Sequence, residues 1–218
     1  MSGGRTLRPA LFDVDGTLVD SMDAVAETFD RIMREEAGIV RPREYYRRFV
    51  GPPLSESFAE LGVAPGYFVG AYRRRYSAKE LELSLFDGIE AMLERLHEAG
   101  MPMAIATSKR TEAAVALLER LGVARRFVAV CGADESRGRT AKRWIVGDAL
   151  EALEAAGVDV SNAVMVGDRK YDVHGAAAHG LPTVLVRWGA APEEEYALAW
   201  RTAETPGQLA DLLIAGVS

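Results

Sequence analysis

Residues 9–18 read PALFDVDGTL, an apolar run that ends in two aspartates, a glycine and a threonine. A short apolar run bounded by polar turn residues is typical of a buried strand in a parallel sheet. Open α/β folds bind their ligands at the carboxyl ends of such strands. Asp13 and Asp15 are therefore predicted to lie at the ligand-binding edge of a sheet.

Four further apolar runs have the same strand-like character, and helical patterns separate them. They cover residues 103–106, 127–130, 163–166 and 183–186. Apolar residues recur at helical spacing between them, as in Ile89, Leu93 and Leu96. Alternation of strands and helices predicts an α/β fold with a doubly wound, Rossmann-like and mainly parallel sheet.

A long stretch after the first strand departs from this rhythm, because it lacks comparable β-branched runs. Its apolar residues recur at helical spacing instead: Val25, Phe29, Ile32 and Met33. Glycine and proline at residues 38, 42 and 51–53 break this pattern into separate helices. We predict an α-helical cap domain at residues 19–85, inserted into a core domain that comprises residues 1–18 and 86–218.

Composition limits the classes of partner. The chain has 218 residues, of which 49% are hydrophobic and 27% charged, as in an ordinary globular protein, and its net charge is -6. A negative chain does not attract nucleic acid polymers or anionic membranes, which favours a small ligand held at a local cationic site. Residues 1–8 lack the apolar core of a signal peptide. We expect a cytoplasmic protein, monomeric or homodimeric.

Two hydroxyl residues, Thr107 and Ser108, directly follow the second strand and precede a helix. Taken alone, residues of this kind commonly cap the following helix. If they share a sheet edge with Asp13, their hydroxyls and free backbone amides could instead hold phosphate oxygens.

Asp168 closes the fourth apolar run, and Asp172 follows four residues later. Two more carboxylates are thus predicted at the edge that carries Asp13 and Asp15. Four acids at one edge would repel one another unless a cation lay among them. Oxygen ligands and a small anionic substrate indicate Mg2+.

A cation for the substrate is harder to select by spacing. Lys142 opens the helix before the fourth strand, but three arginines compete with it for an anion-binding role: Arg137, Arg139 and Arg143.

The motifs DVDGTL at residues 13–18, TS at 107–108, a downstream lysine and GDRKYD at 167–172 occur in the order and spacing of one known family. The chain resembles the haloacid dehalogenase superfamily of phosphatases. Its helical insertion is similar to the small cap of the branch that contains phosphoglycolate phosphatases, β-phosphoglucomutases and 5'-nucleotidase-like phosphatases.

The resemblance implies a phosphoric monoester hydrolase that acts on a small phosphorylated substrate. Asp13 would attack phosphorus and form an aspartyl phosphate, and Asp15 would be the general acid and base. Residues expected to bind the substrate are Gly16, Thr107, Ser108 and Lys142. Magnesium would be held by the Asp13 carboxylate, the Asp15 backbone carbonyl and Asp168, with Asp172 assisting directly or through water.

Cap residues are expected to read the leaving group, and we predict Arg47 or Arg48, beside the Gly-Pro-Pro turn at residues 51–53, as a substrate contact. Two alternatives remain open. A β-phosphoglucomutase-like phosphosugar mutase would use the same motifs, and a non-catalytic regulator could bind a phosphate ligand without turnover. Dehalogenation is disfavoured because a leaving halide needs no general acid, whereas Asp15 is present.

Overall fold

The computed structural model describes residues 9–80 and 82–215. The predicted core-domain residues 1–8 and 216–218, and residue 81 of the predicted cap, lie outside these ranges. Six parallel strands form one sheet in the order β5-β4-β1-β6-β7-β8. They are β1 (Ala10–Phe12), β4 (Met103–Arg110), β5 (Ala129–Ala133), β6 (Val164–Gly167), β7 (Thr183–Val186) and β8 (Arg201–Ala203).

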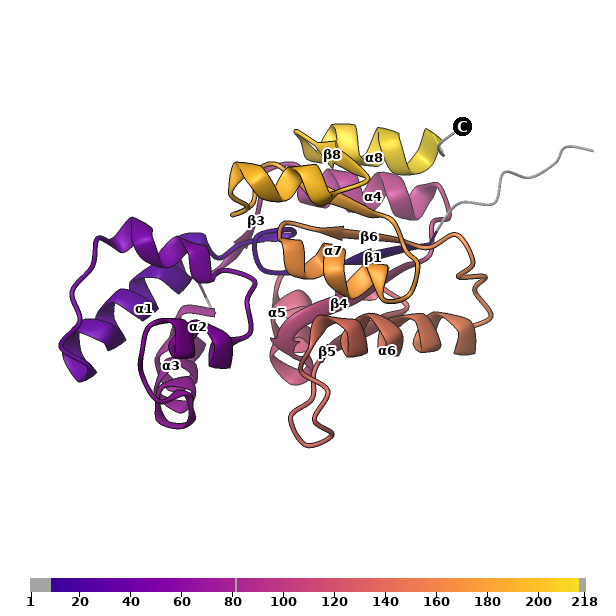
Figure 1. Cartoon of the computed structure of the whole chain (residues 1–218). Coiled ribbons are helices and arrows are strands. Elements are labelled where there is room, and N and C mark those ends of the chain that lie inside the picture. Colours follow the sequence, from indigo (N-terminus) through magenta and orange to yellow (C-terminus); the bar gives the residue numbers. More distant parts are fainter. Residues whose placement is uncertain (1–8, 81, 216–218) are drawn as a thin grey trace, which may run out of the picture.

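Helices cover both faces of this sheet (Figure 1). On one face lie α4 (Ile89–Glu98), α5 (Thr111–Arg120) and α8 (Pro206–Ala215), and on the other lie α6 (Lys142–Ala155) and α7 (Lys170–Ala177). The prediction of a doubly wound, mainly parallel α/β fold is confirmed. None of the described helices is long and apolar enough to cross a membrane.

Strand β1 is central and is buried on both faces. Phe12 packs in the cluster beneath α4, α5 and α8, whereas Leu11 packs in the cluster beneath α6 and α7. Neighbouring side chains of a strand point to opposite faces, so an uninterrupted apolar run fits a strand covered on both sides. Asp13, the next residue, is therefore held at the carboxyl edge between β4 and β6.

A helical region is inserted between β1 and α4, and it lies to one side of the sheet in Figure 1. It contains α1 (Met22–Glu36), the 3-10 helix η1 (Arg43–Phe49), α2 (Leu54–Glu60) and α3 (Pro65–Glu80). Phe29 is fully buried at its centre, with ring centroids of Phe49, Phe58 and Tyr72 between 4.9 and 5.1 Å away. Aromatic packing thus gives the insertion a small core of its own.

Two short antiparallel strands, β2 (Val19–Asp20) and β3 (Ser84–Leu85), join the insertion to the sheet. They pair at the points where the chain leaves and re-enters the core. We propose on this basis to keep the predicted division into a core of residues 1–18 and 86–218 and a cap of residues 19–85.

Some strands differ from their predicted positions. β5 begins two residues later than the apolar run at 127–130, because Phe127 packs against Phe12 and Val128 is half-exposed. β2, β3 and β8 were not predicted from the sequence. Two further 3-10 helices, η2 (Ala124–Arg126) and η3 (Glu193–Leu198), complete the described elements.

Candidate active site

Three carboxylates converge where β1 and β6 end. Asp13, Asp168 and Asp172 each offer an oxygen that lies within 4.8 Å of the others, and all three residues are at most 3% exposed. The backbone places them, because the Asp13 amide donates to the Val166 carbonyl at 2.9 Å and extends the β1–β6 pairing to the sheet edge. Three of the four acids predicted to converge are therefore brought together, and Asp15 is not part of this cluster.

This concentration of buried negative charge is unfavourable without a counterion. Burial and the Asp172 carboxylate raise the pKa of Asp13 to about 6, although Lys142 and a hydrogen bond from Thr107 oppose the rise. Burial, followed by the charges of Asp172 and Asp13, raises the pKa of Asp168 well above its usual range. A buried acid with a raised pKa favours either a proton or a nearby cation.

Lys142 supplies the protein's own cation. Its Nζ lies 3.0 Å from Asp13 Oδ1 and 2.7 Å from Asp172 Oδ1, and its side chain is 6% exposed. The two carboxylates raise the pKa of Lys142 although burial alone would lower it. Gly175 makes room for the lysine stem, since a Cβ on that glycine would lie 2.6 Å from Lys142 Cγ. Lysine therefore stays charged next to Asp13.

The three arginines that competed with Lys142 in the sequence lie elsewhere. Arg139 pairs with Asp148, Arg143 stacks on Trp144, and Arg137 is exposed. The structure thus brings the lysine, and none of these arginines, to the acidic cluster.

The carboxylate oxygens of the three aspartates differ in whether they accept a hydrogen bond. Asp13 Oδ1 accepts the Val14 amide at 2.8 Å, and Asp172 Oδ2 accepts the Arg169 amide at 3.0 Å. Asp168 Oδ2 accepts the Ala190 amide at 2.9 Å, but the buried Asp168 Oδ1 has no hydrogen-bond partner within residues 9–80 and 82–215. An orphaned buried oxygen beside two other carboxylates fits a divalent cation that prefers oxygen ligands.

Gly16 lies directly against this cluster. Its φ is +80°, and a Cβ there would lie 2.3 Å from Asp168 Oδ2. Gly189 flanks the same aspartate from the other side, where a Cβ would lie 2.3 Å from Asp168 Cβ. Both glycines allow the backbone to approach the carboxylate closely, which explains why the motif residue after Asp15 has no side chain.

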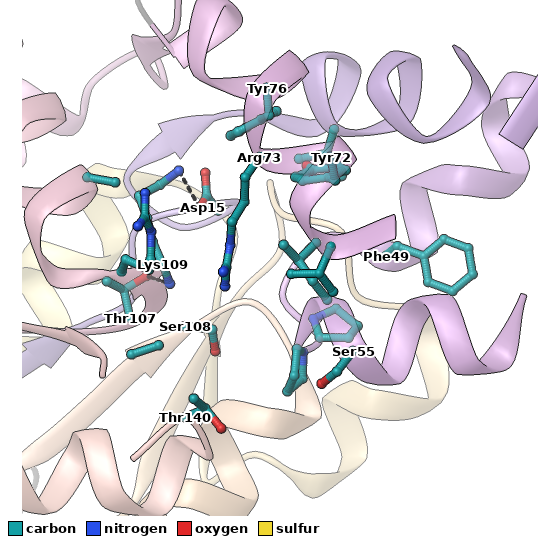
Figure 2. A pocket seen from close by; sticks show the side chains of 18 of the residues that line it. Asp15, Phe49, Ser55, Tyr72, Arg73, Tyr76, Thr107, Ser108, Lys109 and Thr140 are labelled. Carbon is teal, nitrogen blue, oxygen red and sulfur yellow. Dashed lines mark hydrogen bonds and ion pairs between the residues drawn. The ribbon is translucent and has the colours of Figure 1, made fainter. Parts of the chain in front are cut away.

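A cavity of about 500 Å3 opens onto Asp13 and Asp15 between the insertion and the core. Thr107 and Ser108 line it from the core side (Figure 2). They belong to the end of β4 and precede the α5 N-cap, Arg110, so neither residue caps that helix. The Thr107 hydroxyl accepts the Lys109 amide at 3.3 Å, and phosphate binding by these two hydroxyls stays a prediction.

Lys109 is a site residue that the sequence analysis missed. Its Nζ lies 3.3 Å from Asp15 Oδ2 and 2.7 Å from Glu80 Oε1 at the end of α3, and its side chain is 6% exposed. Figure 2 shows Lys109 directed at Asp15, with Tyr76 of α3 close by. No family motif singles this lysine out, but its place directly after Ser108 at a strand end was an available signal.

Arg47 and Arg48, predicted as substrate contacts, do not line the cavity. Arg47 pairs with Asp23 at 2.7 Å, Arg48 pairs with Glu60 at 2.9 Å, and both side chains are more than half exposed. The prediction took two arginines beside a turn for a substrate-binding patch. In the structure, ion pairs with acids of α1 and α2 hold both arginine side chains at the surface. Two other arginines line the cavity, Arg73 and Arg110.

A family model described as "Haloacid dehalogenase-like hydrolase" matches residues 10–186, a range that begins with β1 and includes every site residue predicted from the sequence. The chain belongs to the haloacid dehalogenase-like hydrolase family. The predicted resemblance is thereby confirmed.

Relatives in this family carry different names. The chain is 36% identical over 191 residues to the tyrosine-protein kinase PtkA of Mycobacterium tuberculosis, covering 86% of this chain and 65% of that protein. It is 31% identical to a phosphoglycolate phosphatase of Xanthomonas campestris, covering 93% and 94%, and 29% identical to a 5'-nucleotidase of Pseudomonas aeruginosa, covering 85% of each. A predicted phosphatase from Clostridium acetobutylicum has a similar crystal structure, with a TM-score of 0.85, 30% identity and coverage of 95% and 98%.

The chain thus spans about two thirds of the length of the PtkA proteins it matches, and nearly the whole length of the phosphoglycolate phosphatase.

Proposed function

We propose that this chain is a Mg2+-dependent phosphatase that hydrolyses a small phosphate monoester through an aspartyl phosphate on Asp13. The observation that carries the proposal is the position of Asp13. Its carboxylate is buried between the Lys142 ammonium at 3.0 Å and two further carboxylates, and it faces the same cavity as Asp15. Relatives named phosphatase and nucleotidase support the reaction class.

The nucleophile is oriented by its neighbours. Asp13 Oδ1 is held by the Val14 amide and by Lys142, which leaves Oδ2 for attack on phosphorus. Attack forms the bond from Asp13 Oδ2 to phosphorus and breaks the bond from phosphorus to the leaving oxygen. Asp15 gives its proton to that oxygen. Water then attacks phosphorus, Asp15 takes the water proton, and inorganic phosphate leaves with Asp13 restored.

Charge on the transferring phosphoryl group is what the site must stabilise. Lys142 lies next to Asp13 and supplies a positive charge there, while Thr107 and Ser108 supply hydroxyl donors on the cavity wall. Buried and preorganised donors act strongly on such charge because little water screens them.

Residues fit for a divalent cation are Asp13 and Asp168, with the Asp15 backbone carbonyl as the third protein ligand that the family pattern implies. Among the described residues, Asp168 Oδ1 has neither a hydrogen-bond nor an ion-pair partner, whereas Asp172 Oδ1 is ion-paired with Lys142 at 2.7 Å and Asp172 Oδ2 accepts the Arg169 amide. We propose that Asp172 positions Lys142 and, as the third carboxylate of the cluster, assists in holding the cation directly or through water. A bound Mg2+ would neutralise the carboxylates and polarise the phosphoryl oxygens.

The cavity indicates the size of the leaving group. Its volume of about 500 Å3 lies in the range of sites for drug-sized ligands, and it is large for a two-carbon acid. Phe49, Val50, Pro53 and Tyr72 form an apolar wall, and Arg73 and Arg110 add polar groups. We expect a leaving group of nucleoside or sugar size to be preferred over glycolate.

Phosphate release from a panel of monoesters tests this proposal. The panel holds p-nitrophenyl phosphate, 2-phosphoglycolate, nucleoside monophosphates and hexose phosphates, each with Mg2+ or EDTA, and Asp13→Asn is the control. Mg2+-dependent release that the variant lacks is expected. If the folded wild-type protein releases no phosphate from any member, the proposal fails, and a phosphosugar mutase or a binding protein becomes the better interpretation.

Transfer of a phosphoryl group to a protein tyrosine is a second candidate, favoured by the 36% identity to PtkA. It is tested by incubating the chain with radiolabelled ATP and a tyrosine-containing peptide. Acid-stable label on tyrosine would support the kinase. Release of labelled phosphate with no label on tyrosine would contradict the kinase.

A further inference from the structure

Arg169, which directly follows Asp168, reaches from the core to the inserted region. Its guanidinium Nη1 donates to the backbone carbonyls of Arg48, at 2.9 Å, and of Val50. These carbonyls belong to residues 48–53, here called the strap, which leave η1 and enter α2. The strap matters for the site because Val50, Gly51 and the two prolines after them line the cavity.

A buried carboxylate fixes this guanidinium from the other side. Glu195 of η3 accepts Arg169 Nε at 3.0 Å and Nη2 at 3.2 Å, and it also accepts the Lys170 amide at 2.7 Å. Arg169 and Glu195 are 5% and 4% exposed. The planar fork of arginine is suited to this two-sided arrangement, which a lysine ammonium could not reproduce.

Gly51 lets the strap lie flat on the arginine. Its φ is +94°, and a Cβ there would lie 2.7 Å from Arg169 Cγ. Val50 and Gly51 lie outside helices and strands. The Val50 carbonyl accepts its hydrogen bond from the Arg169 side chain instead of from the backbone of a helix or strand. Contact and hydrogen bonding therefore fix the strap at the same arginine.

The same residue is tied to the reaction centre through its backbone. The Arg169 amide donates to Asp172 Oδ2 at 3.0 Å, and Arg169 follows Asp168 in the chain. We infer that Arg169, held by Glu195, is a positioning residue that fixes the strap over the reaction centre and thereby sets how the leaving group is bound. This inference rests on the proposed phosphatase function, but the placement of the strap can be tested without it.

Four variants separate the contributions of the Arg169 hydrogen bonds, the buried Glu195 charge and the Gly51 contact to the position of the strap. Arg169→Lys keeps a positive charge near Glu195 but loses the fork to the two carbonyls. The double variant Arg169→Met with Glu195→Gln removes the fork without leaving a buried carboxylate unpaired. Gly51→Ala displaces the strap and leaves Arg169 and Asp168 unchanged. Arg95→Met is the matched control, because Arg95 pairs with Asp211 at the surface, remote from the cavity.

The first readout is hydrogen exchange of the Val50 and Gly51 amides, measured without substrate. Only variants whose thermal unfolding shows that they are folded are compared. We expect exchange to become about tenfold faster or more in the three strap variants, since the ties that hold the segment are lost, and to be unchanged in Arg95→Met. Unchanged exchange in all three strap variants would overturn the inference, whatever the activity.

Steady-state kinetics give the second readout, with acetyl phosphate and the best large substrate of the panel. We expect KM for the large substrate to rise about fivefold or more in the three variants, and kcat/KM for acetyl phosphate to stay within about twofold of wild type. Equal losses for both substrates would place Arg169 in the machinery around Asp168 and would contradict a role in leaving-group binding. Absence of all activity in the wild type would refute the phosphatase, and the exchange data would still decide whether Arg169 holds the strap.

Discussion

Replacing Asp13 with asparagine is expected to stabilise the metal-free protein while abolishing its activity. Asp13 is buried, and its folded-state pKa of about 6 lies above the ordinary value of 3.8. Folding therefore favours the protonated form, and ionisation of Asp13 at neutral pH opposes folding. Asparagine has the shape of the neutral acid and can still accept the Val14 amide, and Lys142 keeps its partner Asp172 at 2.7 Å.

The size of the effect follows from the pKa rise. A shift from 3.8 to about 6 corresponds to roughly 3 kcal/mol at pH 8, because each pKa unit is worth about 1.4 kcal/mol. Below the unfolded pKa both states are protonated, and the penalty vanishes. It grows as the pH rises towards 6 and is constant above that value, so the expected difference at pH 5 is about half of that at pH 8.

Urea unfolding monitored by circular dichroism, in EDTA at several pH values between 5 and 8, measures this difference. Magnesium should stabilise the wild type more than the variant, since a ligand that binds only the folded state raises its stability. If Asp13→Asn were less stable than wild type at pH 8 in EDTA, or if the difference did not change with pH, the description of Asp13 as an unfavourably buried charge would be refuted.

Three further substitutions test separate parts of the structure. Lys109→Met should lower kcat by about tenfold to a hundredfold, because it removes the ion pair that fixes the Asp15 carboxylate at the cavity, whereas Lys170→Met, which alters a half-exposed side chain, should not. Gly16→Ala should abolish Mg2+-dependent turnover, and in urea it should destabilise the fold by more than Gly38→Ala does. Both glycines have positive φ, but a Cβ would collide with Asp168 at Gly16 and would meet nothing at Gly38. Phe29→Ala should cost about 3–5 kcal/mol of stability in the same assay, since the buried ring is the centre of the inserted helices, and a loss below about 1 kcal/mol would contradict that role.

The fold could be predicted to the extent that its strands are buried on both faces. Residues 183–186 form β7 as predicted, because all four are buried and apolar or β-branched. β8 escaped detection since Arg201 is exposed and only Ala203 is fully buried, which leaves no apolar run. A short edge strand of this kind is defined by its neighbour β7 more than by its own residues.

The acidic cluster was accessible from the sequence because Asp13 and Asp168 directly follow parallel strands, whose carboxyl ends meet at one edge, and Asp172 lies in the first turn of the next helix. Lys142 needed the family pattern, since spacing alone did not distinguish it from three nearby arginines. Contacts between the insertion and the core could not be predicted from the sequence. Lys109 with Glu80, and Arg169 with Val50, join residues far apart in the chain whose pairing no local pattern encodes.

Covalent labelling of Asp13 tests the central claim most directly. Acetyl phosphate needs little help from a general acid, so Asp15→Asn should still form the aspartyl phosphate but hydrolyse it slowly. Borohydride reduction of the trapped protein, followed by peptide mass spectrometry, should then find homoserine in place of aspartate at residue 13, and Asp13→Asn should give none. Phosphate release by the wild type with no modification at residue 13 in the trapped protein, or with the label on another residue, would contradict the account.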